Sequence, residues 1–476
     1  MGEARARFRL GTGRRRALQA AAALTVGGLL IAAAGPTQAA SAAGPAKPAS
    51  AAGPAKLASG PGPAKLASGA GSVGSTADCD SLTTCYTPQE LQVAYGVKPL
   101  LDRGIDGRGE TVVLPEVGEV SGQPPAVSDI RQDLVKFDAL FHLPAAHLRA
   151  VTTLAGGSAQ WLAYGEEVLD VEMVHAIAPG ASIDIVLLPP TALANDANAV
   201  ASAIASLRLA STLGGIVSAS EGGQVGGEQC TTKANADRVD AVLREDASRH
   251  VTVVAASGDS GAAAESCSLI PQGQYTPVKG VTLLSSDPYV LGAGGTTLTA
   301  SRTTGAWVSE TAWGLPYGDP GSLFQASSGG FSRFFGRPAY QDGVPGIGAA
   351  RGVPDVAADA NGHTAMAMVI STGPQGRYIR DGGGTSAAAP LWAALIALAD
   401  QYAGRHLGFV NPAIYRIAES ASYHQAFHDI TSGNNTAEFP PVTIAGYHAR
   451  AGWDPVTGWG SPDAQYLIPL LARYAS

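Results

Sequence analysis

The stretch Gly382-Gly383-Gly384-Thr385-Ser386-Ala387-Ala388-Ala389-Pro390 leads directly into the apolar run Leu391–Ala399. Three glycines allow a sharp turn, and the apolar run that follows predicts a helix over Ser386–Tyr402. A serine at the start of a helix exposes its hydroxyl beside backbone N–H groups that lack helical partners. The stretch therefore offers a nucleophile with part of an oxyanion hole, although an ordinary serine N-cap after a glycine turn looks the same.

Outward from this helix, apolar runs alternate with amphipathic stretches, which is typical of strands joined by helices in a parallel sheet. We therefore expect a three-layer α/β/α fold with a mainly parallel central sheet. No second linker interrupts the sequence after Asp78, so residues 78–476 are expected to form one domain. The expected strands are Thr111–Leu114, Ile183–Leu188, Gly215–Ala219, Val251–Ala256 and Tyr289–Leu291, and the other expected helices are Gly165–Ile177, Asp196–Leu207 and Lys233–Ser248.

The N-terminal residues have the order of a secretory signal. Arginines up to Arg16 precede an apolar stretch, Ala17–Ala34, and small residues follow it, which predicts a signal over residues 1–39. A membrane anchor is the alternative, and the paired arginines also admit twin-arginine export. Residues 40–77 repeat Gly-Pro-Ala-Lys at 44–47, 53–56 and 62–65 and contain few large apolar residues, so we interpret them as a linker.

Composition narrows the class of protein. The chain has 476 residues, 45% of them hydrophobic and 15% charged, which is enough to bury a large core. Removing residues 1–39, which carry six Arg and one Glu, takes the formal charge from −8 to −13. This acidic balance argues against a nucleic-acid groove and suits an acidic medium.

Four cysteines, Cys79, Cys85, Cys230 and Cys267, predict two disulfides in an exported protein. Proximity in sequence favours the pairs Cys79–Cys85 and Cys230–Cys267. A zinc site is the alternative, but no Cys-x-x-Cys pair is present.

A serine nucleophile needs a base, and the usual partner is a histidine held by an aspartate. The nine histidines are scattered singly, so we expect surface or satisfied side chains at His175, His363, His428 and His448. Glu166 and Asp170 instead lie four residues apart on one face of the helix expected over Gly165–Ile177. Two carboxyls held together share protons, which makes one of them a base suited to acid, whereas a solvated acidic helix face is the ordinary alternative.

A third acid, Asp259, follows the expected strand Val251–Ala256, at the edge where active-site groups of parallel sheets collect. Its segment, Gly258-Asp259-Ser260-Gly261, contains the Gly-Asp-Ser-Gly of chymotrypsin-like enzymes. That fold is a pair of antiparallel barrels and requires a histidine segment that is absent here, so Asp259 and not Ser260 is the candidate.

These three segments together resemble the sedolisin family of serine-carboxyl peptidases, whose fold is similar to that of subtilisin and whose signature is Gly-Thr-Ser, three residues and Pro. The resemblance covers the chain after Asp78 and implies Ser386 as nucleophile, Glu166 as general base, Asp170 as the acid that orients the base, and Asp259 as oxyanion-hole donor. Glu167 is the competing position for the base, and the four-residue spacing to Asp170 favours Glu166. Glu116 resembles a family glutamate that extends the acid network.

The family also carries one structural calcium ion near its C-terminus, which the resemblance places in the segment 427–461. The implied ligands are the carboxylates of Asp429 and Asp454 and the carbonyls of Ile430, Arg450 and Gly452. Carboxylates with carbonyls from tight turns make an oxygen cage for a hard cation. A surface loop with two capping aspartates is the alternative.

The resemblance implies a secreted, monomeric endopeptidase or tripeptidyl peptidase that acts on polypeptides at acidic pH. No nucleic acid and no stable membrane association after signal removal are expected. Two departures stand out: only the signal and repeat precede Asp78, where the family usually has a folded prodomain, and Glu221 stands where an aromatic residue is common. The competing interpretations are a catalytically silent binding domain of the same fold and an ester hydrolase, for which the Gly-x-Ser-x-Gly elbow is missing.

Overall fold

The central sheet follows the strand order β14-β8-β7-β6-β1-β5-β3, in which every neighbouring pair is parallel. One further strand, β9, runs antiparallel along β8. The bounds are β1 Thr111–Val117, β3 His147–Thr152, β5 Ser182–Leu188, β6 Ile216–Ala219, β7 Thr252–Ala256, β8 Val290–Ala300, β9 Trp307–Ala312 and β14 Val356–Asp359.

Successive side chains of these strands point to opposite faces of the sheet, and both faces are buried. In β1, Val112 and Leu114 pack into one buried cluster of side chains and Val113 into another, and in β7 Val254 and Val253 divide in the same way. A strand that buries both faces reads as a continuous apolar run, as parallel strands between two helix layers do. The apolar runs in the sequence therefore become the middle layer.

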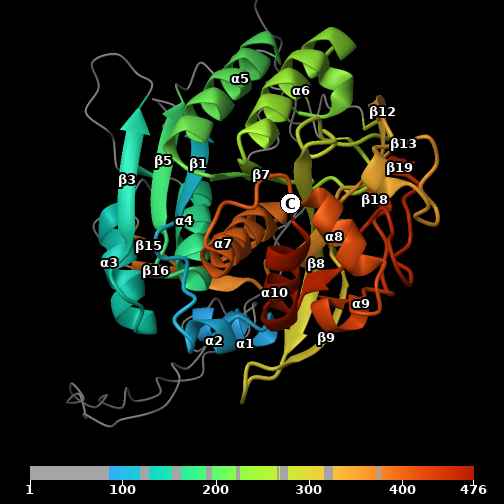
Figure 1. Ribbon diagram of the computed structural model, residues 1–476. Helices are drawn as coiled ribbons and strands as arrows, with labels where there is room; N and C mark the ends of the chain where they lie inside the picture. The colour runs from blue at the N-terminus through green and yellow to red at the C-terminus, as the bar shows by residue number, and fades with distance from the viewer. Residues whose placement is uncertain are drawn as a thin grey trace, which may run out of the picture. The chain divides into compact units, whose positions relative to one another are not determined.

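Helices cover both faces of the sheet, which gives the expected three layers (Figure 1). Helices α5 (Asp196–Leu213) and α6 (Lys233–Ser248) pack on one face against β1, β5, β6 and β7. Helices α4 (Gly165–Ile177) and α7 (Thr385–Ala403) pack on the other face and against each other. The other helices are α1 Pro88–Ala94, α2 Lys98–Leu101, α3 Ile130–Phe141, α8 Asn411–Ala418, α9 Tyr423–Ala426 and α10 Ala464–Tyr474.

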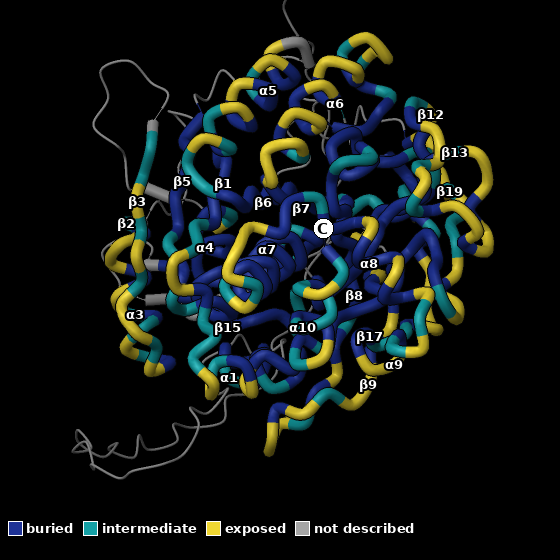
Figure 2. The backbone as a smooth tube through the Cα atoms, viewed as in Figure 1, coloured by how far each residue is buried: buried dark blue, intermediate teal, exposed yellow. Residues whose placement is uncertain are grey.

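Helix α7 packs against the sheet on one side and against helix α10 on another, and almost all of its length is buried (Figure 2). Its composition explains this position, because a helix that is apolar on every side must be enclosed. The contacts of α7 with β6, β7, β8 and β14 fix its N-terminus, which carries Ser386, at the carboxyl edge of the sheet.

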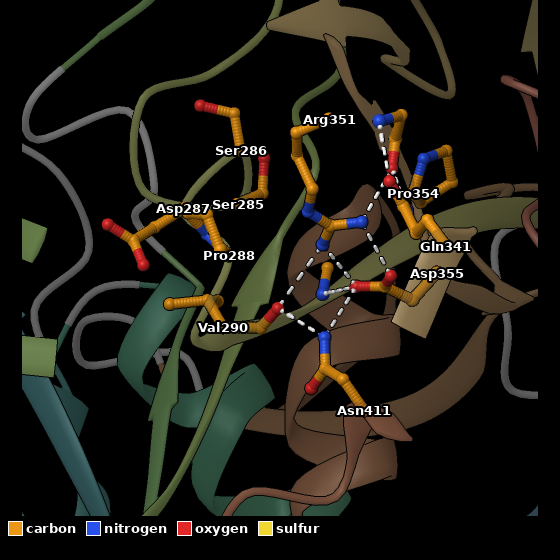
Figure 3. A network of polar contacts seen from close by, with 12 residues as sticks. Ser285, Ser286, Asp287, Pro288, Val290, Gln341, Arg351, Pro354, Asp355 and Asn411 are labelled. Carbon is orange, nitrogen blue, oxygen red and sulfur yellow. Dashed lines mark hydrogen bonds and ion pairs between the residues drawn. The ribbon is translucent and has the colours of Figure 1, made fainter. Parts of the chain in front are cut away.

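A buried polar network joins β8, β14 and α8 at the opposite, amino edge of the sheet (Figure 3). The Arg351 guanidinium donates to both carboxylate oxygens of Asp355, at 2.7 and 2.6 Å, and both side chains are fully buried. Arg351 and Asn411 also donate to the Val290 carbonyl at the start of β8. The network ties three segments that are distant in sequence to one point.

Short strand pairs complete the fold. The longest is the hairpin of β15 (Met366–Ser371) and β16 (Arg377–Gly382), which ends at the glycines before α7. The others are β2 Ser128–Asp129 with β4 Leu162–Ala163, β10 Gly314–Leu315 with β11 Gln325–Ala326, β12 Gly330–Gly336 with β13 Ala350–Val353, β17 Phe427–His428 with β20 Ser461–Pro462, and β18 Ala437–Phe439 with β19 Val442–Ile444.

The structure is a computed structural model that describes residues 85–117, 128–152, 162–163, 165–188, 196–220, 226–264, 267, 277–315, 325–371 and 377–475. All of these residues belong to one compact unit, Ala70–Ser476. The expected signal, the repeat, Cys79 and Glu221 lie outside the described residues. Within these ranges, none of the helices combines the length and the apolar character needed to cross a bilayer.

The expected elements are present, with shifted ends. Helix α5 continues to Leu213 and not to Leu207, and the strand expected at Tyr289–Leu291 is the first part of the longer β8. The predicted disulfide Cys230–Cys267 is confirmed. Cys85 is also disulfide-bonded, but its expected partner Cys79 is not among the described residues.

Candidate active site

Ser386 is the second residue of α7 and is partly exposed. Gly384 precedes the helix with a φ of +89°, a conformation that favours glycine. A side chain there would also place its Cβ 2.7 Å from Oδ2 of Asp259, and one at Gly382 would lie 2.4 Å from Cδ1 of Leu169 in α4. The glycines before Ser386 thus let two other segments approach the start of α7 closely.

The proline that closes the motif has a specific consequence for Ser386. Pro390 has no N–H, so it cannot donate the helical hydrogen bond to the carbonyl four residues earlier, which is that of Ser386. The hydroxyl of Ser220 donates to this carbonyl instead, at 3.1 Å. Because Ser220 directly follows β6 and is buried, this bond fixes the backbone of Ser386 to the edge of the sheet.

Asp259 contacts Thr385, the residue before Ser386. The Thr385 N–H and hydroxyl both donate to Oδ1 of Asp259, at 2.8 and 2.9 Å, and the same hydroxyl accepts from the Gly258 N–H at 3.0 Å. Burial raises the pKa of Asp259, and the two hydrogen bonds from Thr385 offset part of that rise. With Oδ1 accepting two donors, the proton of the neutral acid belongs on Oδ2.

Helix α4 carries the carboxyls expected to serve as base and orienting acid. Glu166 and Asp170 lie one turn apart on the same face, as their spacing predicts. Asp170 is fully buried, Glu166 is partly exposed, and Glu167, the competing position, is buried. The helix packs against α7, and Leu169 lies next to Gly382 at the turn before Ser386.

Glu116 lies in β1 near the same carboxyl edge and is fully buried. His175, in contrast, contacts α3 and the loop that follows it: its Nε2 lies 3.0 Å from Oδ1 of Asp138 in α3 and 2.9 Å from the Pro144 carbonyl. Its Nδ1 is buried without a hydrogen-bond partner among the described residues, so the expectation of a satisfied histidine holds for Nε2 only.

Two residues that contact the candidate site residues were not predicted from the sequence, Ser220 and Thr385. Thr385 is part of the quoted motif, but its contact with Asp259 joins residues 126 apart and has no periodic signature. Ser220 could have been found from its place directly after an apolar strand, where side chains of parallel sheets meet.

Comparisons with known proteins are consistent with this geometry. No family model matches the chain. Kumamolisin from Bacillus sp. (strain MN-32) is 33% identical over 410 residues, which cover 83% of this chain and 65% of kumamolisin. This chain belongs to the sedolisin family. Sedolisin from Pseudomonas sp. (strain 101) is 32% identical over 246 residues, covering 51% of this chain and 39% of sedolisin.

The chain thus spans less than two thirds of the length of either relative. A solved structure of Pseudomonas sedolisin, a serine-carboxyl proteinase complexed with two molecules of pseudo-iodotyrostatin, aligns with a TM-score of 0.66 at 24% identity. The alignment covers 83% of this chain and all of the sedolisin chain. The two proteins therefore share the same fold.

The calcium ligands implied for a sedolisin-family chain lie together around one turn. The Gly452 N–H donates to both carboxylate oxygens of Asp429, at 3.1 and 3.2 Å, and the Arg450 N–H donates to Oδ2 of Asp454 at 3.1 Å. Ile430 is buried directly after Asp429. The turn 450–454 therefore lies between two carboxylates.

Charge at this turn fits a cation. Asp454 is fully buried, and burial raises its pKa to about 6. Across the described ranges, no Lys or Arg forms an ion pair with Asp429 or Asp454, and the guanidinium of Arg450 donates to the Pro345 and Trp453 carbonyls instead. The charges of the two carboxylates thus have no cationic partner in the described part of the chain, although Asp454 also accepts from the Val456 and Thr457 N–H groups and from the Thr457 hydroxyl.

Proposed function

We propose that this chain is a serine-carboxyl endopeptidase that cleaves polypeptides at acidic pH outside the cell, as a monomer. The observation that carries the proposal is the hydrogen-bonded placement of a buried carboxyl, Asp259, against the residue before Ser386. Family membership supports the reaction class, and the basic and apolar order of residues 1–39 supports export.

In the proposed reaction, the Ser386 hydroxyl oxygen attacks the carbonyl carbon of the scissile peptide and its proton passes to Glu166. Oδ2 of Asp259 donates a hydrogen bond to the oxygen that becomes negative. Glu166 then returns the proton to the leaving amine, and water releases the acyl group from Ser386 by the reverse path. Asp170, one turn along α4, orients the base and shares its charge.

The proposed pH dependence follows from Asp259. A carboxyl donates to an oxyanion only while protonated, and the raised pKa keeps Asp259 protonated to a higher pH than an exposed aspartate. Activity is therefore present at low pH and is lost as pH rises through the pKa of Asp259. Glu166 must be ionised to accept the proton, which sets the acid limit.

The proposal is tested with denatured protein as substrate at pH 4 and pH 7, comparing the wild type with S386A and E166Q. We expect cleavage at pH 4 that requires Ser386 and that falls strongly at pH 7. The masses of the products distinguish internal cleavage from the release of tripeptides. The matched control is S260A, which removes the serine next to Asp259 and should keep activity. Equal cleavage by wild type and S386A would contradict Ser386 as the nucleophile, and no cleavage by either would favour a catalytically silent binding domain.

We also propose one structural Ca²⁺ at Asp429, Asp454 and the carbonyls of Ile430, Arg450 and Gly452. The ion would hold the turn 450–454 against β17. Chelation should lower the melting temperature of the wild type, because loss of a ligand that binds only the folded state destabilises it. D429N should melt at the chelated value with or without Ca²⁺. A wild-type melting temperature that is the same with and without chelator would contradict the proposed Ca²⁺ site.

A further inference from the structure

A second group of polar side chains lies at the amino edge of the sheet, away from the carboxyl edge that carries Ser386. Glu110 directly precedes β1, Asp400 is in the last turn of α7, and His406 lies in the loop between α7 and α8. Ser386 and Asp400 are 14 residues apart on one helix, about 21 Å at 1.5 Å per residue. The cluster is therefore separate from the candidate active site.

The three side chains face one another without hydrogen bonds between them. Nε2 of His406 lies 3.7 Å from Oε2 of Glu110, and Nδ1 lies 3.9 Å from Oδ2 of Asp400. One ligand atom from each side chain falls within 4.8 Å of the others. Both distances are too long for a hydrogen bond and close to the roughly 3.4 Å between neighbouring ligands of a tetrahedral ion with bonds of about 2.0–2.1 Å.

Each of the two carboxylates has one buried oxygen without a hydrogen-bond partner among the described residues, although the Glu110 side chain is 12% exposed. Asp400 is fully buried, and its Oδ1 accepts from the Leu407 N–H at 2.9 Å, while its Oδ2, which points at the imidazole, has no hydrogen-bond partner among the described residues. Oε2 of Glu110 is likewise buried and unpartnered there. Buried carboxylate oxygens normally have partners, so two that converge on one imidazole need an explanation.

The chain also leaves space for that imidazole. A side chain at Gly215 would place its Cβ 1.6 Å from Nδ1 of His406, so the ring occupies the position of the missing side chain. The adjacent Gly214 lets the same loop approach the start of β1, where its Cβ would lie 2.6 Å from the Thr111 carbonyl oxygen. The missing side chains at these two glycines leave room for the His406 ring beside the carboxylates.

We propose that Glu110, Asp400 and His406 form a binding site for a divalent transition-metal ion, of which Zn²⁺ is the representative. Imidazole nitrogen and carboxylate oxygen are both zinc ligands, and the two negative charges of the carboxylates balance the charge of the ion. Calcium, which takes oxygen ligands only, would not use His406. His406 is 48% exposed, so its ring is free to turn one nitrogen toward both carboxylates and leaves a coordination position for water.

The test is a calorimetric titration of the untagged chain with Zn²⁺ at pH 7.5, where the donors are deprotonated, in excess Ca²⁺ to fill the Asp429 and Asp454 turn. We expect one equivalent of Zn²⁺ to bind. H406A changes a half-exposed side chain and should fold normally, and it should weaken this binding by at least the 10–100-fold typical of losing a supporting group around a metal. D400N and E110Q should weaken it similarly.

His250 provides the matched control. It lines the neighbouring cavity of about 590 Å³ together with His406 and Arg405, but it is outside the cluster. H250N should bind Zn²⁺ as the wild type does, and Asn tolerates the positive φ of 61° at this position. Absence of binding to the wild type, or binding that H406A leaves unchanged and H250N abolishes, would overturn the site.

Discussion

At the scale of single residues, Thr385 decides which oxygen of Asp259 carries the proton. Its hydrogen bonds lower the pKa of Asp259, so T385V, which removes the hydroxyl donor, should raise that pKa and move the alkaline limit of activity to higher pH. The turnover number should fall on the order of tenfold, the value of one hydrogen bond. The measurement is the pH profile of kcat and kcat/KM.

T385S is the control for this prediction, because it keeps the hydroxyl and loses only a methyl group. Its pH profile should match that of the wild type. If T385V lowers the rate equally at all pH values, Thr385 only packs at the site and does not tune Asp259.

At the scale of elements, the strands and helices with a clear hydrophobic pattern were predicted from the sequence. The strands β1, β5, β6 and β7 and the helices α4, α6 and α7 follow from apolar runs and amphipathic stretches. The second half of β8 was missed because it depends on pairing with β9, and the end of α5 was missed because helix ends carry weak signals. Asp259 and Ser386 were predicted from their motifs, whereas the bond from Ser220 to Ser386 required the fold.

The network of Figure 3 belongs to this scale because it joins β8, β14 and α8. D355A would leave the Arg351 guanidinium buried without its carboxylate, and we expect the free energy of unfolding to fall by about 3–5 kcal/mol. Chemical denaturation of the S386A background measures this without autolysis. D102N, which breaks the exposed pair Lys98–Asp102, is the control and should have little effect. A small effect of D355A would mean that water enters the network.

At the scale of the whole molecule, buried carboxyls make stability depend on pH. Burial raises the pKa of Asp287 to about 7 and that of Asp246 to about 6, and it also raises the pKa of Glu172. A raised pKa stabilises the fold fully below the unfolded value near 4, and this contribution is lost as pH rises through the folded value. We therefore expect S386A to melt several degrees higher at pH 5 than at pH 8.

D287N tests the source of this dependence. Its amide cannot ionise, so the difference in melting temperature between pH 5 and pH 8 should shrink. A melting temperature that rises from pH 5 to pH 8 would show that histidines such as His428, whose pKa is lowered by burial, dominate instead.

The central claim is that a protonated Asp259 serves the nucleophile Ser386, and D259N tests it most directly through kcat/KM from pH 4 to pH 7. The asparagine amide donates a hydrogen bond at every pH while its oxygen accepts from Thr385. The account predicts a lower rate at pH 4 but no fall toward pH 7, and a loss of about 10²–10³ in kcat for D259A. A D259N profile that falls with pH as steeply as the wild-type profile would contradict it.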